Sequence, residues 1–206
     1  MQSQFIEMFG DQKSNPYGLP TATLKEVCTF YSGTGFPNSY QGYTSGKYPF
    51  YKVGDISKNV LRGSKELLDC ENYIDQDIAD KLKGCILPAK TVVFAKIGEA
   101  LKLNRRAITC QDCLIDNNVM GIKPGKALEL EYFFHYMQQL NMGDLAGTTA
   151  MPSVRKSALE KVQIIIPPTE NQKQFAAFSI QSGKSKFATQ PCTLQHLMDA
   201  VIGQEA

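Results

Sequence analysis

Segments with strand character and segments with helical character alternate along this chain of 206 residues. The clearest strand is 91–97, where β-branched and aromatic residues follow one another. The clearest helix is 128–140, where apolar residues recur at helical spacing on one face. A chain that holds both kinds of segment must pack helices against a sheet. The alternation therefore predicts an α/β fold with a mixed sheet, in a domain large enough to form its own core.

Weaker patterns give the remaining elements and their grouping. Further strands are expected at 50–56, 105–109, 113–122 and 162–166, and further helices at 1–9 and 73–83. A stretch rich in Gly, Pro, Ser, Thr and Tyr, residues 30–49, is typical of a loop. We expect three regions, namely an N-terminal helix segment (1–10), a globular domain (11–167) and a C-terminal helix (168–206).

The last region carries a repeat of seven residues. Thr169 and Gln172 have the spacing of a capping box, which predicts that a long helix begins at Thr169. The apolar positions of the repeat are Ile180, Phe187, Leu194 and Val201. This seam is typical of a coiled coil and predicts an intermolecular role, the alternative being a surface helix that packs on its own domain. Pro191 removes a backbone donor and predicts a kink or a frayed end.

Several classes of protein are excluded or disfavoured by composition. No run of about 18 apolar residues is present, which excludes a membrane-spanning helix. The first residues lack the basic and apolar regions of a secretory signal, so we expect a cytoplasmic protein with reduced cysteines. Cys110 and Cys113 have C-x-x-C spacing, but a second such pair or a pair of nearby histidines is missing. We predict two thiols near a strand end and no metal site, with zinc as the alternative.

Sequence motifs of enzymes are also missing. The chain has no G-x-S-x-G, H-E-x-x-H or Walker sequence, and its two histidines, His135 and His196, lie far apart. Carboxylates occur as scattered residues, and Glu99 alone does not make a mechanism. We therefore predict no catalytic residue and no cofactor.

Basic residues gather in the middle of the chain. Residues 81–126 contain nine Lys or Arg and three acidic residues, a net charge of +6, whereas residues 65–80 contain six acidic residues and one lysine. The densest part, 96–106, is expected to form an exposed loop between two strands. A second basic cluster, Arg155 and Lys156, follows the hydroxyl groups of Thr148 and Thr149.

Such clusters suit a nucleic-acid partner. Lysine and arginine on a protruding loop bind phosphates with release of counterions, and Arg or Asn can read base edges. A solvated charged surface is the alternative reading. The predicted DNA-binding residues are Lys96, Lys102, Asn104, Arg105, Arg106, Thr148, Thr149, Arg155 and Lys156. Of these, Asn104 and its neighbours are the predicted readers of base edges.

Five segments, in their order and spacing, resemble the specificity subunit of type I restriction–modification enzymes. They are PFYKVGDI (49–56), TVVFAKIGEA (91–100), DNNVMGI (116–122), GTTAMPS (147–153) and IIIPPTENQ (164–172). The opening QSQFIEMFG (2–10) resembles the end of the conserved helix that precedes a recognition domain in that family. The resemblance covers nearly the whole chain.

The resemblance implies a target recognition domain followed by a conserved long helix, which acts as a dimer spacer and docks the methyltransferase (modification) subunits. Family members usually carry two of each, and this chain has one. We therefore expect a half-subunit that forms a homodimer on a bipartite site in double-stranded DNA and directs the modification and restriction subunits to it. The alternative is the recognition end of a fused DNA methyltransferase–nuclease, which would need motifs such as Asn/Asp-Pro-Pro-Tyr/Phe that this sequence lacks.

Overall fold

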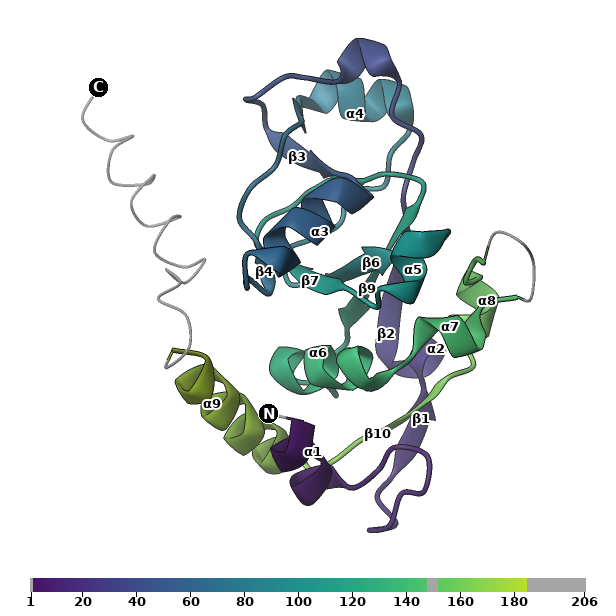
Figure 1. Cartoon of the computed structure of the whole chain (residues 1–206), viewed down its shortest axis with the longest axis vertical. Helices are drawn as coiled ribbons and strands as arrows, with labels where there is room; N and C mark the ends of the chain where they lie inside the picture. The colour runs from purple at the N-terminus through teal and green to yellow at the C-terminus, as the bar shows by residue number, and fades with distance from the viewer. Residues whose placement is uncertain (1, 148–151, 185–206) are drawn as a thin grey trace.

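A five-stranded sheet with the order β2-β9-β6-β7-β4 forms the centre of the computed structural model, which describes residues 2–147 and 152–184 (Figure 1). Neighbouring strands are antiparallel except β4 and β7, which are parallel. The strands are β2 (Cys28–Ser32), β4 (Glu66–Leu67), β6 (Val92–Ala95), β7 (Arg106–Thr109) and β9 (Val119–Pro124). The predicted α/β fold with a mixed sheet is confirmed.

Helices cover both faces of this sheet. On one face lies α6 (Leu130–Gln139), with α1 (Gln2–Phe9) and α9 (Thr169–Lys184) packed beyond it (Figure 1). On the other face lies α3 (Val53–Leu61). The short helices are α2 (Leu24–Val27), η1 (Asn38–Tyr40), α4 (Gln76–Leu82), α5 (Glu99–Lys102), α7 (Met142–Leu145) and α8 (Lys156–Leu159).

Two smaller sheets flank the central one. The first pairs β1 (Thr21–Thr23) with β10 (Gln163–Ile165). The second has the order β5-β3-β8, from the strands β3 (Tyr48–Tyr51), β5 (Tyr73–Ile74) and β8 (Leu114–Ile115). In the second, the rings of Phe36 and Phe50 stack with their centroids 3.7 Å apart. This small sheet and α4 form the upper end of the molecule in Figure 1.

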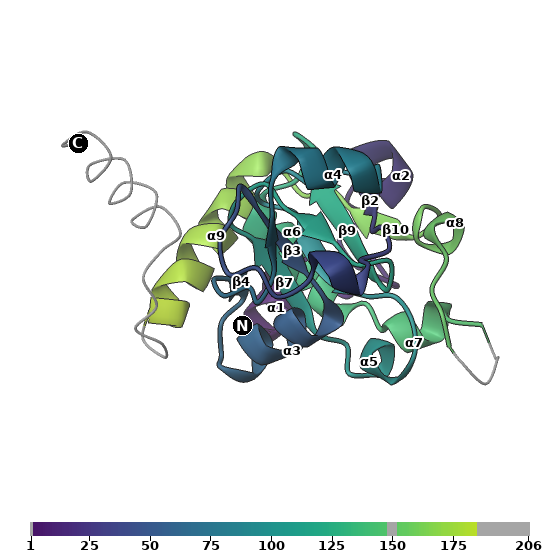
Figure 2. The same cartoon turned by 90° about the horizontal axis from the view of Figure 1, so that it is seen from above.

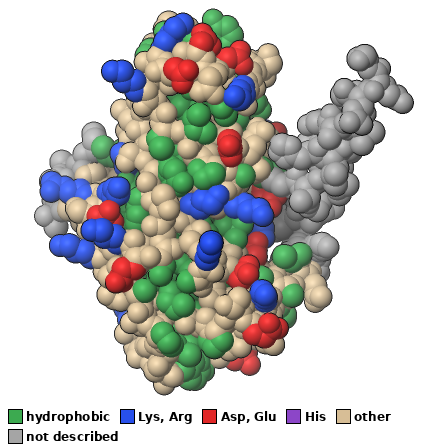
Figure 3. All heavy atoms as spheres, turned by 180° about the vertical axis from the view of Figure 1, so that it is seen from behind, with side chains coloured by type: hydrophobic (Ala, Val, Ile, Leu, Met, Phe, Trp, Pro, Cys, Tyr) green, Lys and Arg blue, Asp and Glu red, His purple; other side chains and the backbone are tan. Residues whose placement is uncertain are grey.

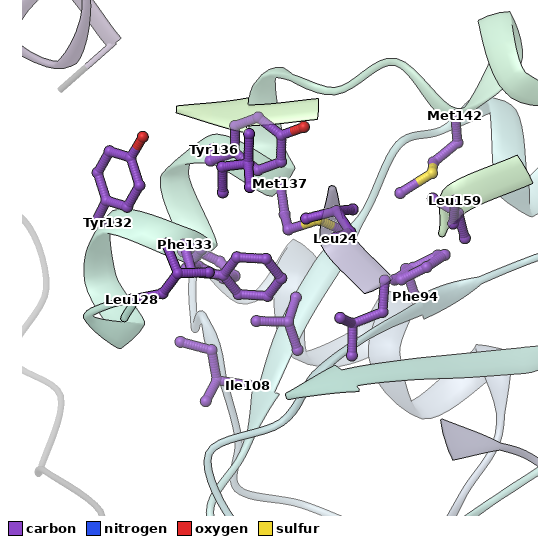
Figure 4. Close-up of a cluster of buried hydrophobic side chains, with 14 of the residues drawn as sticks. Leu24, Phe94, Ile108, Leu128, Tyr132, Phe133, Tyr136, Met137, Met142 and Leu159 are labelled. Carbon is purple, nitrogen blue, oxygen red and sulfur yellow. The ribbon is translucent and has the colours of Figure 1, made fainter. Parts of the chain in front are cut away.

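The core follows from the alternation of side chains along the central strands. Val92 and Phe94 of β6 point into the larger core, beneath α6, whereas Val93 points into a smaller core with Ile56 of α3. Both faces of β6 are therefore buried, which explains why its sequence is apolar throughout. Figure 4 shows the larger core, where side chains of β6, β7 and α6 meet those of α2, α7 and α8.

Local contacts move several boundaries away from the sequence prediction. The predicted strand 50–56 is wrong in its second half, because a helix begins at Val53: the backbone N–H of Lys52 donates to the Asp55 carboxylate (2.7 Å) at the start of α3. The predicted strand 113–122 is two strands, β8 and β9, separated by a turn. The predicted helix 73–83 begins as strand β5 and becomes helical at Gln76.

The contact between α9 and α6 is partly aromatic. Phe175 of α9 is fully buried, and its ring lies 5.3 Å from Phe5 and 5.5 Å from Phe9, both of α1. The ring of His135 on α6 lies edge-on to Phe175 at 5.1 Å. Helices α1 and α9 therefore share one core with α6.

A buried amide completes this contact. Gln172 is 1% exposed; its side chain accepts a hydrogen bond from the backbone N–H of Glu129 (2.8 Å) and donates to the carbonyls of Ala127 (3.0 Å) and Pro167 (2.8 Å). Helix α9 begins at Thr169 as predicted. The predicted capping box is wrong, because the Gln172 side chain makes its hydrogen bonds to Glu129, Ala127 and Pro167 instead.

The described part of α9 packs on its own domain, as the alternative interpretation held. Of the four seam residues only Ile180 lies among the described residues, and its side chain is 44% exposed. Phe187, Leu194 and Val201, with Pro191, lie outside the described residues. The intermolecular seam therefore stays a prediction. Across residues 2–147 and 152–184, no helix has the length and apolar character that crossing a membrane requires.

We predict that Gln172→Ala lowers the free energy of unfolding by about 1–3 kcal/mol, because one N–H and two carbonyls lose their partner in a buried place. Urea unfolding measures this loss. The control is Lys173→Ala, an exposed position on the same helix, which we expect to change stability by no more than about 0.5 kcal/mol. Equal stability of the two variants would contradict the assignment.

A second prediction concerns pH. Burial lowers the pKa of His135 below its ordinary value of 6.5, although Glu131 nearby acts in the opposite direction. The unfolded chain then binds a proton at a higher pH than the folded chain, so the free energy of unfolding falls as the pH drops below about 6.5. We expect His135→Gln to show a smaller fall between about pH 7 and pH 5. Parallel pH profiles of the two proteins would refute this.

Candidate nucleic-acid interface

One edge of the central sheet collects the segments that carry the predicted site. Strand β6 ends at Ala95, β9 begins at Val119 and β7 begins at Arg106. Because β6 is antiparallel to both neighbours, these three ends meet at the same edge. The residues that follow or precede them are the basic loop 96–105 and the turn 116–118.

The two basic clusters of the sequence meet at this edge. The backbone N–H of Val154 donates to the carbonyl of Lys96 (2.9 Å), and the N–H of Gly98 donates to the carbonyl of Pro152 (2.8 Å). Ile97 and Ser153 form an antiparallel bridge between these two bonds. The loop after β6 and the segment that leads into α8 are therefore joined side by side (Figure 1).

Three cations of these clusters carry no ion pair with any described residue. They are Lys96 and Arg105, both partly exposed, and Arg155, which is exposed at the start of α8. In Figure 3, blue side chains gather at the left edge of the molecule, at the height of α5, α7 and α8 in Figure 1. An unpaired cation at a surface keeps its full charge for an incoming phosphate.

Two other predicted cations already have partners. Lys102 pairs with Glu99 within α5 (2.7 Å), and Lys156 pairs with Glu160 (3.8 Å) while it lies 5.9 Å from the centre of the Phe30 ring. Exposed pairs of this kind contribute little to stability, so either lysine can exchange its carboxylate for a phosphate at small cost.

Arg106 does not reach this surface. Its side chain is 3% exposed and points beneath α6, where Nε donates to the carbonyl of Met137 (3.0 Å) and a terminal nitrogen donates to the carbonyl of Leu140 (2.8 Å). The guanidinium also lies over the ring of Phe94, 5.6 Å from its centre. Burial lowers the pKa of Arg106 to about 10, so the group stays charged at neutral pH. The prediction that Arg106 contacts phosphate is wrong: this arginine holds the C-terminal end of α6.

Asn104 belongs to the same hydrogen-bond network as Arg106. Its Oδ1 accepts from the Arg106 guanidinium (2.6 Å) and from the backbone N–H of Met142 (3.1 Å), and its amide nitrogen donates to the carbonyl of Gln138 (3.4 Å). Its backbone has a positive φ of 54°. The amide is thus occupied by hydrogen bonds to α6 and α7. The structure therefore does not support Asn104 as a reader of base edges.

The predicted loop 96–106 contains one helical turn, α5, with Leu101 buried beneath it. The chain between β6 and β7 is therefore anchored at Leu101, Asn104 and Arg106 and presents its charged side chains from a fixed backbone. Thr148 and Thr149 lie outside the described residues.

One thiol of the C-x-x-C pair lies in the core. Cys113 is fully buried, and burial raises the pKa of its thiol above the usual range. Among residues 2–147 and 152–184, no three or more His, Cys, Asp or Glu side chains are grouped so as to hold a metal ion.

Residues 18–183 match a known family, described as the type I restriction modification DNA specificity domain. The chain is 25% identical over 167 residues to the "Type I restriction enzyme MjaIX specificity subunit" of Methanocaldococcus jannaschii. The aligned region covers 79% of this chain and 37% of that protein.

Solved structures show the same fold. The HsdS subunit from Thermoanaerobacter tengcongensis superposes with a TM-score of 0.63 at 18% identity, over 98% of this chain and 49% of that one. The S subunit of a type I restriction–modification system from M. genitalium superposes with a TM-score of 0.51 at 12% identity, over 79% and 39%. The chain thus spans at most about half the length of these proteins.

We predict that alanine substitutions of the adjacent Arg105 and Arg106 differ in their effect on the free energy of unfolding. Arg106→Ala leaves the carbonyls of Met137 and Leu140 without a donor, so we expect a loss of about 1–3 kcal/mol in urea unfolding. Arg105→Ala, the matched control, should change stability by no more than about 0.5 kcal/mol. Arg106→Lys should also lose stability, because an ammonium lacks the planar fork that reaches both carbonyls. Equal stability of both alanine variants would contradict the conclusion that Arg106 holds the C-terminal end of α6.

Proposed function

Because this chain belongs to the family of type I restriction–modification DNA specificity domains, we propose that it is a non-catalytic DNA-recognition subunit that selects the site where modification and restriction subunits act. The observation that carries the proposal is the meeting of two basic segments at one sheet edge, where Lys96, Arg105 and Arg155 have no acidic partner among the described residues.

The mechanism begins with the phosphates of the DNA backbone. Cations at this edge displace counterions from the duplex and set the position and orientation of the protein. Lys96, Arg105 and Arg155 supply the first contacts, and Lys102 and Lys156 join by giving up their pairs with Glu99 and Glu160. Because the backbone of the basic loop 96–105 is fixed by Leu101, Asn104 and Arg106, little ordering entropy of that loop is lost on binding.

We also propose partners for this chain. Since it spans 49% of the HsdS subunit from Thermoanaerobacter tengcongensis, we propose that two copies together supply two recognition domains. Residues 11–167 would form the recognition domain and residues 168–206 the arm that joins the copies and docks the methyltransferase subunits. Two-fold symmetry then gives a double-stranded DNA site with two inverted half-sites.

The test measures how DNA affinity depends on salt. We expect the wild-type chain to bind a duplex with a logarithmic affinity that falls linearly with log salt. In the triple variant Lys96→Ala/Arg105→Ala/Arg155→Ala the slope should decrease by roughly 0.9 for each phosphate that the protein no longer neutralises. Fluorescence anisotropy of a labelled duplex, over a range of salt concentrations, gives both slopes.

The control is a variant of equal charge change elsewhere on the surface, Lys13→Ala/Lys126→Ala/Lys173→Ala, whose residues are all exposed. Its slope should stay close to that of the wild type. If both triple variants lower the slope equally, the sheet edge is not the binding site, and if the wild-type chain binds no duplex, the proposed function fails.

A further inference from the structure

We propose that the turn between β8 and β9 is the base-reading element of this domain, and that the side-chain amides of Asn117 and Asn118 contact base edges in the major groove, with adenine as the preferred base. This inference rests on the proposed function. It gives a specificity role to two residues that the sequence pattern places inside a strand.

The turn lies directly beside the basic loop. The backbone N–H of Lys96 donates to the carbonyl of Asn118 (2.9 Å), one residue beyond the last pair of the β6–β9 ladder, Ala95 with Val119. Residues opposite each other in an antiparallel pair extend their side chains from the same face of the sheet. Lys96 and Asn118 are thus neighbours at the end of this pair, and Lys96 is a cation that we assign to phosphate binding.

The backbone of the turn is held in place from several sides. The Asp116 carboxylate accepts from the N–H of Asn118 (2.7 Å), and the Asp116 carbonyl accepts from the N–H of Val119 (2.9 Å). The N–H of Asp116 donates to the carbonyl of Tyr51 in the small sheet (2.9 Å), and Thr34 forms a parallel bridge with Asp116.

Glycine at position 33 makes this close approach of two segments feasible. A Cβ atom at Gly33 would lie 1.9 Å from the carbonyl oxygen of Asp116, well inside contact distance. The central sheet, the small sheet and the segment 33–34 therefore fix the turn together. A turn fixed in this way presents its side chains without an ordering cost at the moment of binding.

The amides of the turn are available, unlike that of Asn104. Both asparagines are exposed, and neither side chain makes a hydrogen bond to another described residue, whereas the Asn104 amide is used by Arg106, Met142 and Gln138. An asparagine amide offers one acceptor and two donors, which match N6 and N7 of adenine in the major groove. The chain therefore has, next to its phosphate-binding cations, two polar groups of the type that distinguishes bases.

The acidic charge of the turn does not oppose this role. Asp116 is only partly exposed, and its carboxylate is occupied by the N–H of Asn118. Lys96 lies opposite Asn118 and supplies a compensating charge. The exposed side chains of the turn itself are thus the two amides.

The experiment selects binding sites from a random duplex pool with the full chain, and compares the wild type with Asn117→Ala and Asn118→Ala. We expect the wild-type selection to contain invariant adenines. At least one variant should lose the preference at one adenine position, with a discrimination between bases that falls on the order of 10- to 100-fold. The salt slope of non-specific binding should stay that of the wild type, since both substitutions leave the phosphate-binding cations in place.

Asn171→Ala is the matched control, because Asn171 is an exposed asparagine on α9, away from this edge. It should keep every base preference. Asn117→Ser and Asn118→Ser serve as second variants should an alanine variant fold poorly, since serine keeps turn propensity but cannot make a bidentate contact to adenine.

The outcomes separate the two proposals. If the wild type binds duplex DNA but both turn variants keep the wild-type selection, or if the wild-type selection contains no adenine preference, the base-reading inference is overturned while the proposed function stands. If the wild type binds no duplex at any salt concentration, the proposed function itself is overturned.

Discussion

A buried positive charge holds the candidate interface together. Burying the Arg106 guanidinium carries a desolvation free energy that is unfavourable. This is offset by hydrogen bonds to the carbonyls of Met137 and Leu140 and the amide of Asn104, and by the ring of Phe94. Carbonyls at a helix C-terminus carry partial negative charge, so this end of α6 is a favourable place for a cation. The basic loop, α6 and α7 therefore have one relative position, because any other would leave the charge without partners. The cations of the basic loop 96–105 depend on the buried Arg106 for their placement.

Features with a local cause could be predicted from the sequence. Strands β6 and β7 and helix α6 are predicted within a few residues, because their patterns of apolar residues report burial directly. The sequence prediction assigns Arg105 and Arg106 one role, because adjacent arginines look alike in composition. The period of two along a strand contains the signal that separates them: neighbouring residues point to opposite faces, and Arg106 stands opposite Phe94, a core residue.

Features with a tertiary cause could not be predicted. Thr169 and Gln172 have capping-box spacing, yet the free N–H of Glu129 and two carbonyls compete for the same amide and bind it. The sequence cannot show this, because the N–H of Glu129 and the carbonyl of Ala127 lie about 40 residues away, before α6. The second carbonyl belongs to Pro167, just before α9. The turn at 116–118 is an intermediate case. Its composition, Asp-Asn-Asn, is typical of a turn, but the apolar residues on both sides predict a single strand.

In the proposed dimer, the position of α9 would give the domain two independent determinants of recognition. Helix α9 is fixed to α6 by Phe175 and Gln172, on the opposite side of the molecule from α7 and α8 in both views (Figures 1 and 2). The same α6 is fixed at its other end to the basic edge by Arg106. The direction of α9 relative to that edge is therefore set by one helix that both contacts share. In the proposed dimer, the contacts of α6 with α9 would set the distance between half-sites, and the turn at 116–118 would set their bases. Because no described side chain takes part in both, half-site spacing and base preference would change separately in such a dimer.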